Sequence, residues 1–395
     1  MNNKALAPLF SIVITGKFID RPNRFIVHCE IAGKTIAAYL PNPGRMWELL
    51  FADVTLYLIP NAANLKTRFT VVAVEREGQL IMLHTHATNE AVERLLVAGL
   101  IPGLQDASVV RREVTVGAHR FDFLLNKAGK PLYLEVKSCT LFDGPIAMFP
   151  DAVTLRGKRH LAALAALALR EIPCGVLFLV HWPQAAFFMP DYHTDLAFAQ
   201  TFCQVRQQLE FYPVAINWEA DFSFASIVKP LAIPWQLLET EVHDSGSYIM
   251  IMELEQAENI AVGSLGALNF PAGFYLYIGT AKKNLTQRVN RHLGKRKKYH
   301  WHIDYLRAKA AKCTAVPIRS SESLEHPLAQ AVRVIADWQV PGFGASDCHC
   351  ATPLFAMQDN PLHSRQFIEL LQYFRIGRLA VKLGCEQQVS QEPGK

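Results

Sequence analysis

Short alternating segments fill the first eighty residues, and this feature most restricts the fold that the chain can adopt. Apolar side chains occupy every second position in each segment, which is the period of a half-buried β-strand. Turn residues such as Pro41–Gly44 separate the segments. The five segments are Phe10–Thr15, Arg24–Glu30, Lys34–Tyr39, Val54–Ile59 and Phe69–Glu75. Five short strands at this spacing predict a small OB-like β-barrel over residues 1–82.

The pattern changes to mixed helices and strands beyond residue 83. Helices are predicted at Ala91–Leu100, Lys158–Arg170 and Thr194–Leu209, and strands at Val109–Val116, Phe121–Leu125, Leu132–Lys137 and Val176–Val180. This mixed order predicts an α/β domain over residues 83–235. Two prolines break the periodicity between Lys229 and Asp244, and we place a domain boundary there.

A third domain is predicted over residues 243–360. Its expected elements are the strands Tyr248–Leu254 and Phe274–Gly279 and the helices Leu285–Leu293, Ile303–Ala311 and Leu328–Trp338. Residues 361–395 show no clear pattern and are assigned to a tail. The chain is therefore expected to be a multidomain protein of mixed α/β and α+β class.

Length and composition indicate a folded protein with more than one core. The chain has 395 residues, of which 50% are hydrophobic and 19% charged. Its longest apolar run, Leu161–Leu169, is far shorter than the ~20 residues that cross a bilayer. No apolar stretch near the N-terminus resembles a secretion signal, and the eight cysteines form no Cys-x-x-Cys pair. We expect a cytoplasmic protein that has no membrane partner.

Positive charge is concentrated in one segment. Eleven Lys and Arg residues lie between Lys282 and Lys312 against one acid, Asp304, although the whole chain carries only +5. Such a block is either a solvated face or a surface that contacts phosphates. The composition leaves both interpretations open.

Two neighbouring strands place acidic side chains opposite each other. Apolar and polar residues alternate in Phe121–Leu125 and in Leu132–Lys137, and the turn between them pairs the two apolar faces. The apolar pairs in this register are Phe121 with Val136, Phe123 with Leu134, and Leu125 with Leu132. Asp122 then lies opposite Glu135, and Lys137 follows two residues along the same face.

Facing acids repel each other unless a cation lies between them. A hard ion such as Mg²⁺ or Mn²⁺ takes carboxylate oxygens, so Asp122 and Glu135 are candidate metal ligands. Lys137 is a candidate to orient a water molecule or to neutralise charge on a phosphate. The alternative is a solvated hairpin face on which Lys137 merely pairs with an acid.

A longer series of motifs resembles the sugar fermentation stimulation protein family over roughly residues 14–230. The matching motifs are Arg111-Arg112-Glu113-Val114, Arg120-Phe121-Asp122-Phe123, Leu134-Glu135-Val136-Lys137-Ser138 and Phe149-Pro150-Asp151-Ala152-Val153-Thr154. The resemblance implies DNA binding and an OB-type barrel joined to a PD-(D/E)xK restriction-nuclease-like core. Its metal and catalytic set carries over to Asp122, Glu135 and Lys137. Pro43 and Leu155 depart from the family pattern, and Leu155 replaces an acid.

The predicted helix after these motifs begins with basic residues. Arg156 and His160 are four positions apart and therefore share one face of that helix. They are candidates to bind a DNA phosphate near the hairpin. A basic helix end exposed to solvent is the alternative.

A second candidate site lies on the helix Leu285–Leu293. Arg288, Arg291, His292 and Lys295 fall on one stripe of this helix, opposite apolar side chains. The stripe is expected to be exposed and to follow strands that carry paired tyrosines. Arginine binds phosphate bidentately, and a phenol or an imidazole beside it can take part in proton transfer.

This region resembles the GIY-YIG nuclease family over about residues 246–357. The resemblance rests on Gly246-Ser247-Tyr248, Tyr277-Ile278-Gly279, His300-Trp301-His302-Ile303-Asp304-Tyr305-Leu306 and Pro341-Gly342-Phe343-Gly344-Ala345-Ser346-Asp347-Cys348. It implies Tyr248 and Tyr277 as motif tyrosines, Arg288 as catalytic arginine, and His292 as a base or phosphate contact. Glu325 matches the single metal-binding glutamate. Ser247 and Pro327 depart from the family pattern.

The sequence therefore predicts a DNA-binding, metal-dependent nuclease with two candidate active sites. Further DNA contacts are assigned to Arg291, Lys295, Arg296, Lys297 and Lys298. The alternatives are a non-catalytic DNA-binding regulator on nuclease-like scaffolds, and a protein with one active and one inert site. Cys348 and Cys350 are interpreted as structural thiols, because the remaining ligands of a zinc site are missing nearby.

Overall fold

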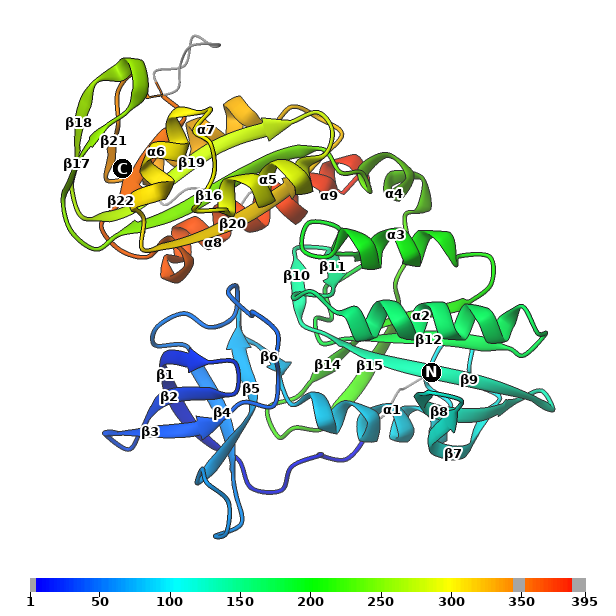
Figure 1. The fold of residues 1–395 in the computed structure, drawn as a ribbon. Coiled ribbons are helices and arrows are strands. Elements are labelled where there is room, and N and C mark those ends of the chain that lie inside the picture. The colour runs from blue at the N-terminus through cyan, green and yellow to red at the C-terminus, as the bar shows by residue number, and fades with distance from the viewer. Residues whose placement is uncertain (1–4, 344–351, 386–395) are drawn as a thin grey trace. The chain divides into compact units, whose positions relative to one another are not determined.

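The computed structural model describes residues 5–343 and 352–385 (Figure 1). These residues divide into two compact units, one running up to Leu238 and resumed from Leu379, the other being Glu239–Arg378. No helix within the described ranges is long and apolar enough to cross a membrane. Cys348 and Cys350 lie outside the described residues.

The N-terminal strands form a closed barrel, as the sequence predicts. The barrel strands are β1 (Ile14–Asn23), β2 (Ile26–Ile31), β3 (Lys34–Tyr39), β4 (Thr55–Pro60) and β5 (Phe69–Arg76), and β6 (Gln79–Met82) pairs with β5 outside the closed ring. Their order is β3-β2-β1-β4-β5-β6, and pairing of Tyr39 with Thr70 joins β3 to β5 and closes the barrel. The first strand was predicted at Phe10–Thr15, which is too early. Its alternation is interrupted because β1 shifts register twice against β2.

The second part of this unit is a mixed sheet flanked by helices. Its strands are β7 (Ala107–Val116), β8 (His119–Lys127), β9 (Lys130–Cys139), β12 (Cys174–Val180), β14 (Glu210–Trp218) and β15 (Phe224–Pro230). The order is β15-β14-β12-β9-β8-β7, and β9, β12 and β14 run parallel. The strands β10 (Leu141–Asp143), β11 (Ile146–Phe149) and β13 (Phe187–Pro190) form a separate three-stranded sheet.

Helices cover both faces of the larger sheet, which confirms the α/β class (Figure 1). They are α1 (Thr88–Val97), α2 (Leu155–Ala168) and α3 (Leu196–Gln204). Leu95 of α1 packs with Leu177 of β12 in one buried cluster. The next residue of β12, Phe178, points to the opposite face and contacts Phe202 of α3, with ring centroids 6.0 Å apart.

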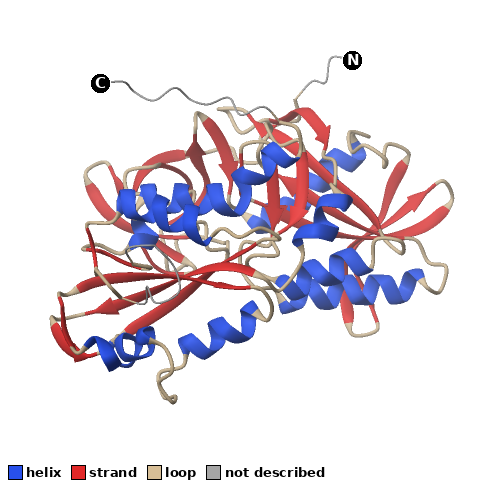
Figure 2. Cartoon of the chain, turned by 90° about the horizontal axis from the view of Figure 1, so that it is seen from above, coloured by secondary structure: helices blue, strands red, loops and turns tan. Residues whose placement is uncertain are grey.

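The unit Glu239–Arg378 is built on an antiparallel sheet in the order β20-β16-β19-β22-β21. Its strands are β16 (Gly246–Leu254), β19 (Gly273–Ala281), β20 (Lys312–Arg319), β21 (Trp338–Gln339) and β22 (Leu354–Met357). The strands β17 (Glu258–Ala261) and β18 (Ala267–Phe270) form a separate two-stranded antiparallel sheet. The helices of this unit are α5 (Leu285–Leu293), α6 (His302–Lys309), α7 (Glu325–Ile335) and α8 (Arg365–Gln372). The helices α4 (Trp235–Glu241) and α9 (Arg378–Lys382) span the points where the chain passes from one unit to the other. The described residues form both helices and strands (Figure 2), and the two kinds of element follow one another in mixed order, as expected for α/β and α+β domains.

Two segments contain more structure than the sequence pattern indicated. The proposed boundary between Lys229 and Asp244 includes the helix α4. Residues 361–385, which were assigned to a tail, form α8, a π-helical turn at Tyr373–Gly377 and α9. Both segments are short, so their periodicity is too brief to be recognised in the sequence.

Candidate functional sites

Strands β8 and β9 form an antiparallel hairpin in the predicted register. The pairs include Phe123 with Leu134 and Leu125 with Leu132. At the end nearer Asp122, the ladder stops at the pair of Phe123 with Leu134. Beyond this pair, the Asp122 carboxylate accepts a hydrogen bond from the Val136 N–H at 2.7 Å. The predicted pair of Phe121 with Val136 is not part of the ladder, because the Asp122 side chain takes the backbone donor that the pairing would use.

Asp122 is also held by a residue that the sequence did not indicate. Asn89 of α1 donates from Nδ2 to Asp122 Oδ1 at 2.8 Å. Burial and the charge of Glu135 raise the pKa of Asp122, while Lys137 and the two hydrogen bonds oppose this rise. The Asp122 carboxylate is therefore kept in position beside a second acid that disfavours its ionised form.

Glu135 is the most constrained side chain of the site, with 3% of its surface exposed. Its Oε1 atom accepts a hydrogen bond from the Lys137 ammonium and lies 2.5 Å from His160 Nδ1. Burial would raise the pKa of Glu135, but Lys137 and His160 together hold that pKa below its usual value. The other oxygen, Oε2, is buried and has no hydrogen-bond partner among the described residues.

His160 and Arg156 occupy different environments although they share a helix face. His160 is buried and contacts Glu135, so its imidazole is part of the acid cluster rather than a free surface group. Arg156 lies on the first turn of α2 and lines the same cleft as Lys137. The predicted position of the helix start near the hairpin is confirmed, while the DNA contacts of both residues stay predictions.

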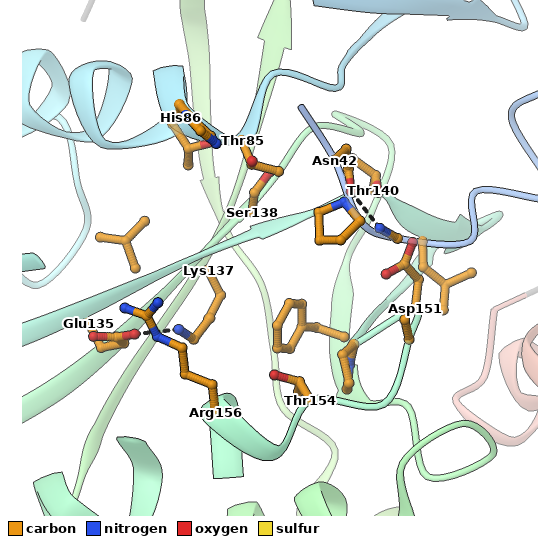
Figure 3. Close-up of a pocket in the computed structure, with 18 of the residues that line it drawn as sticks. Asn42, Thr85, His86, Glu135, Lys137, Ser138, Thr140, Asp151, Thr154 and Arg156 are labelled. Atoms are coloured by element: carbon orange, nitrogen blue, oxygen red, sulfur yellow. Dashed lines mark hydrogen bonds and ion pairs between the residues drawn. The ribbon is translucent and has the colours of Figure 1, made fainter. Parts of the chain in front are cut away.

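A cleft of about 600 Å³ opens beside the hairpin (Figure 3). It is lined by parts of the barrel and of the α/β domain, which belong to the same unit. Its lining includes the polar and charged residues Arg24, Asn42, Asn89, Asp122, Glu135, Lys137, Ser138, Asp151 and Arg156. Positive and negative side chains therefore face one solvent-accessible space.

A loop of the barrel closes one side of this cleft. Gly44 lies so close to Asp151 that a β-carbon at position 44 would come within 2.0 Å of the carboxylate. Arg21 donates to the backbone carbonyls of Asn42, Gly44 and Arg45, which fixes the loop. The glycine is thus required by a close approach between the barrel and the loop that precedes α2.

The second candidate site gathers around Tyr248 on β16. Tyr248 pairs with Gly279 of β19, and its phenol covers that glycine so closely that a β-carbon there would lie 2.4 Å from the ring. Its ring centroid is 5.8 Å from that of His292, which in turn is 6.3 Å from that of Tyr277. The two motif tyrosines and His292 are therefore brought together.

Arg288 and Glu325 complete this cluster. Arg288 donates to the Thr280 carbonyl and stacks over the Trp301 ring, 4.7 Å from its centroid. Glu325 begins α7 and is half-buried. Burial, together with Tyr277 and Glu325, raises the pKa of Tyr248, whereas the Arg288 charge opposes the rise. The charges of both residues thus act on the Tyr248 phenol.

His292 does not lie on an exposed stripe as predicted. It is only 2% exposed and shares the buried face of α5 with Leu285 and Val289. The reason is the helical period, because position 292 is seven residues after 285 and falls on the same face. Burial lowers the pKa of His292 to about 4, so its ring is neutral near pH 7.

Several cations of the basic segment are bound by a buried acid. Asp304 is fully buried and accepts hydrogen bonds from Arg291 at 2.8 Å and from the backbone N–H groups of His300 and Trp301. The Lys297 ammonium lies 2.8 Å from the other Asp304 oxygen. Burial would raise the pKa of Asp304, but these contacts hold it well below its usual range. The predicted DNA contacts of Arg291 and Lys297 stay predictions.

The other basic residues predicted at this site point to solvent. Lys295, Arg296 and Lys298 are exposed, and Lys295 donates weakly to the Ala310 carbonyl at 3.3 Å. The segment therefore combines two cations fixed by Asp304 with others that remain accessible. The exposed residues fit either interpretation of the charge block, and contact with phosphates stays a prediction.

Comparison with known protein families agrees with this architecture. The model of the SfsA N-terminal OB domain matches residues 19–83, and that of the sugar fermentation stimulation protein RE domain matches residues 86–222. A protein from Methanosphaera stadtmanae named sugar fermentation stimulation protein homolog is 38% identical over 211 residues, which cover 52% of this chain and 87% of that protein. The chain belongs to the sugar fermentation stimulation protein family.

Other relatives in this family match the same half of the chain. The homolog from Moorella thermoacetica is 37% identical, and the match covers 56% of this chain and 96% of that protein. The structure of Pyrococcus furiosus SfsA in complex with Ca²⁺ superposes with a TM-score of 0.53 at 26% identity, covering 59% of this chain and 99% of that one. The remaining part matches the domain of unknown function DUF123 over residues 247–375, which is GIY-YIG-like.

Both units contain functional candidates or partners that no local motif indicated. Asn89 lies 33 positions before its partner Asp122, and His181 lies 43 positions after its partner Ser138. Asp304 appeared in a quoted motif, but nothing in the sequence showed that it would bind Arg291. Such partners depend on tertiary packing, so a single sequence carries no signal for them.

Proposed function

We propose that the chain is a divalent-metal-dependent nuclease that acts on DNA, and that the cleft beside the β8–β9 hairpin is an active site. The observation that carries this proposal is Glu135 Oε2, a buried carboxylate oxygen without a partner among the described residues, next to Asp122. Leaving such an atom unsatisfied is costly unless a ligand completes it. Lys137 and Arg156 line the same cleft and fit a phosphate.

The two acids fit an ion of the Mg²⁺ or Mn²⁺ class. Such ions prefer oxygen ligands, often use only one or two carboxylates, and keep several waters. Two carboxylates therefore suffice for such a site, and no larger group of His, Cys, Asp or Glu in the described ranges is arranged to bind a metal ion. Asp122 and Glu135 would hold the ion. When bound, it neutralises charge that develops on a phosphoryl oxygen.

The side chains around the acids have complementary tasks. Lys137 is held by Glu135 Oε1 and brings an ammonium group to the cleft, where it neutralises a phosphate and orients water. Arg156 binds a second phosphate oxygen, and the N-terminal end of α2 adds a favourable field for an anion. The relative that was solved with Ca²⁺ shows that an oxygen-seeking divalent ion is compatible with an SfsA protein.

A second nuclease site is favoured by the convergence of Tyr248, Tyr277, Arg288, His292 and Glu325. We assign Arg288 to the stabilisation of negative charge on the phosphate and Glu325 to a metal ion. Neutral His292 accepts a proton or holds the phosphate from the buried side of α5. The DUF123 domain would then hydrolyse the same class of bond independently of the SfsA part.

Cleavage assays on the full chain test both sites separately. Labelled single-stranded, duplex and branched DNA are incubated with Mg²⁺, Mn²⁺ or chelator, using wild type, Glu135→Gln, Arg288→Ala and the double variant. We expect metal-dependent cleavage that each single variant reduces about 100- to 1000-fold on the substrates of its own site, and that the double variant abolishes. Lys295→Ala, two residues beyond the end of α5, is the control and should affect binding more than turnover.

The rival function is a DNA-binding regulator that retains nuclease folds as scaffolds. It predicts binding to all three DNA forms and no metal-dependent cleavage of any of them by wild type. A rate of cleavage that is equal in wild type and in the double variant would have the same meaning, because a contaminating nuclease would then be responsible.

A further inference from the structure

A chain of three hydrogen-bonding side chains runs behind the cleft without contributing to the acid cluster. Trp218 Nε1 donates to His181 Nδ1 at 3.1 Å, and His181 Nε2 lies 2.9 Å from Ser138 Oγ. The three residues lie at the ends of β14, β12 and β9, which are neighbouring parallel strands. Their carboxyl ends meet at one edge of the sheet, where Ser138 of β9 lines the cleft.

The hydrogen bond from Trp218 determines which ring nitrogen of His181 carries the proton. An indole N–H is only a donor, so His181 Nδ1 must accept and cannot carry a proton. His181 is fully buried, and burial lowers its pKa to about 3, which keeps the ring neutral. Its single proton is therefore on Nε2 and is donated to Ser138 Oγ.

This arrangement excludes one role for Ser138 and leaves another. A serine nucleophile needs a histidine nitrogen that accepts its proton, but His181 Nε2 is a donor here. The Ser138 hydroxyl hydrogen must then find an acceptor elsewhere. The Ser138 hydroxyl makes no other hydrogen bond within the described ranges, and it lines the cleft together with Lys137 (Figure 3).

We propose that Ser138 donates its hydroxyl hydrogen to a phosphodiester oxygen bound in the cleft, and that His181 and Trp218 fix this direction. The proposal rests on the assignment of the cleft to nucleic acid and adds a substrate contact beside the metal ligands. Trp218 and His181 are positioning residues, because they act on the substrate only through Ser138. The ligand is recognised through its phosphate, so the contact itself does not distinguish bases.

The first test determines which ring nitrogen of His181 carries the proton. Nitrogen-15 NMR of the full chain with labelled histidine should show His181 protonated on Nε2 in wild type. In Trp218→Phe the donor to Nδ1 is lost, so the ring is free to place its proton on Nδ1 and to accept from Ser138. A wild-type His181 that carries its proton on Nδ1 would overturn the proposal whatever the activity of the protein.

The second test measures binding of a fluorescent DNA oligonucleotide, in Ca²⁺ and in chelator, without relying on cleavage. Ser138→Ala should weaken binding about 10-fold, as expected for one hydrogen bond to a charged group. Ser138→Thr keeps the hydroxyl and should restore binding to within about 2-fold. Trp218→Phe should resemble Ser138→Ala, and Ser108→Ala, an exposed serine of β7, should resemble wild type.

The outcomes separate this inference from the proposed nuclease function. Weakened binding of Ser138→Ala in a protein that cleaves nothing supports the phosphate contact and contradicts hydrolysis. Metal-dependent cleavage with unchanged binding and turnover in Ser138→Ala supports the nuclease and overturns the role of Ser138. If wild type binds no oligonucleotide under either condition, both proposals fail.

Discussion

At the scale of single residues, the candidate site beside the β8–β9 hairpin is defined by the hydrogen-bond partners of the two Glu135 carboxylate oxygens. One Glu135 oxygen serves both Lys137 and His160, while the other has no partner among the described residues. An acid that only paired with surface lysine would not be buried in this way, which argues against the simple solvated-face alternative. The residue pattern predicted the facing acids, but the role of His160 in holding Glu135 follows only from the packing of α2.

The buried His292 predicts a pH dependence of stability. Its pKa is about 4 in the folded chain and returns to about 6.5 on unfolding, so the unfolded chain binds more protons between these values. Stability contributed by neutral His292 is therefore lost as the pH falls from about 6.5 to about 4. Thermal unfolding should show a larger decrease in Tm between about pH 7.5 and pH 5 for wild type than for His292→Gln. Equal decreases would contradict the burial of a neutral ring.

At the scale of elements, a single acid ties α5 to the start of α6. Asp304 binds Arg291 of α5 and caps the backbone at His300 and Trp301, and Trp301 in turn stacks against Arg288. The position of Arg288 thus depends on a carboxylate that is fully buried. The helical stripe was visible in the sequence, whereas this link between two helices was not.

Removing the Asp304 charge should destabilise the DUF123 domain strongly. Asp304→Asn leaves the Arg291 and Lys297 charges beside a buried neutral group, and breaking a buried ion pair costs about 3–5 kcal/mol. Glu369→Gln breaks an exposed pair with Arg365 and is the matched control, with an expected loss below about 0.5 kcal/mol. Urea unfolding of the full chain measures both. A similar small loss in the two variants would mean that Asp304 does not organise this region.

The elements also show what a single sequence can and cannot predict. The β8–β9 register and the bounds of α5 were predicted correctly, because both have regular periods of two and 3.6 residues. The start of β1 was wrong where bulges interrupt alternation, and α4 was overlooked beside prolines. Local periodicity therefore located the acid pair and Arg288, while Asn89, His181 and the partners of Asp304 required the tertiary fold.

At the scale of the whole molecule, the proposed binding of nucleic acid is expected to depend on which positive charges are accessible. Asp304 neutralises part of the basic segment, so the exposed Arg296 and Lys298 are better placed to contact phosphates than Arg291 or Lys297. The barrel contributes Arg24 to the cleft. Binding is thus expected to depend on several scattered cations rather than on one continuous stripe.

This distribution predicts a measurable salt dependence. The binding constant for duplex DNA should fall with salt at a logarithmic slope of about −0.9 per neutralised phosphate. The double change Arg296→Ala and Lys298→Ala should reduce the steepness by about 2, whereas Lys312→Ala, which removes a cation paired with Glu253, should leave it unchanged. Fluorescence anisotropy over a range of salt concentrations measures the slope. An affinity that does not change with salt would exclude phosphate contacts as the basis of binding.

The most direct test of the central claim, that Asp122 and Glu135 hold a divalent ion, is a calorimetric titration of the full chain with Mn²⁺. Wild type should bind Mn²⁺ at the hairpin, and Glu135→Gln should lose that site because the amide removes a charged ligand while keeping the side-chain shape. Glu325→Gln should retain it, since Glu325 belongs to the other candidate site. Identical Mn²⁺ binding by wild type and Glu135→Gln would contradict the claim.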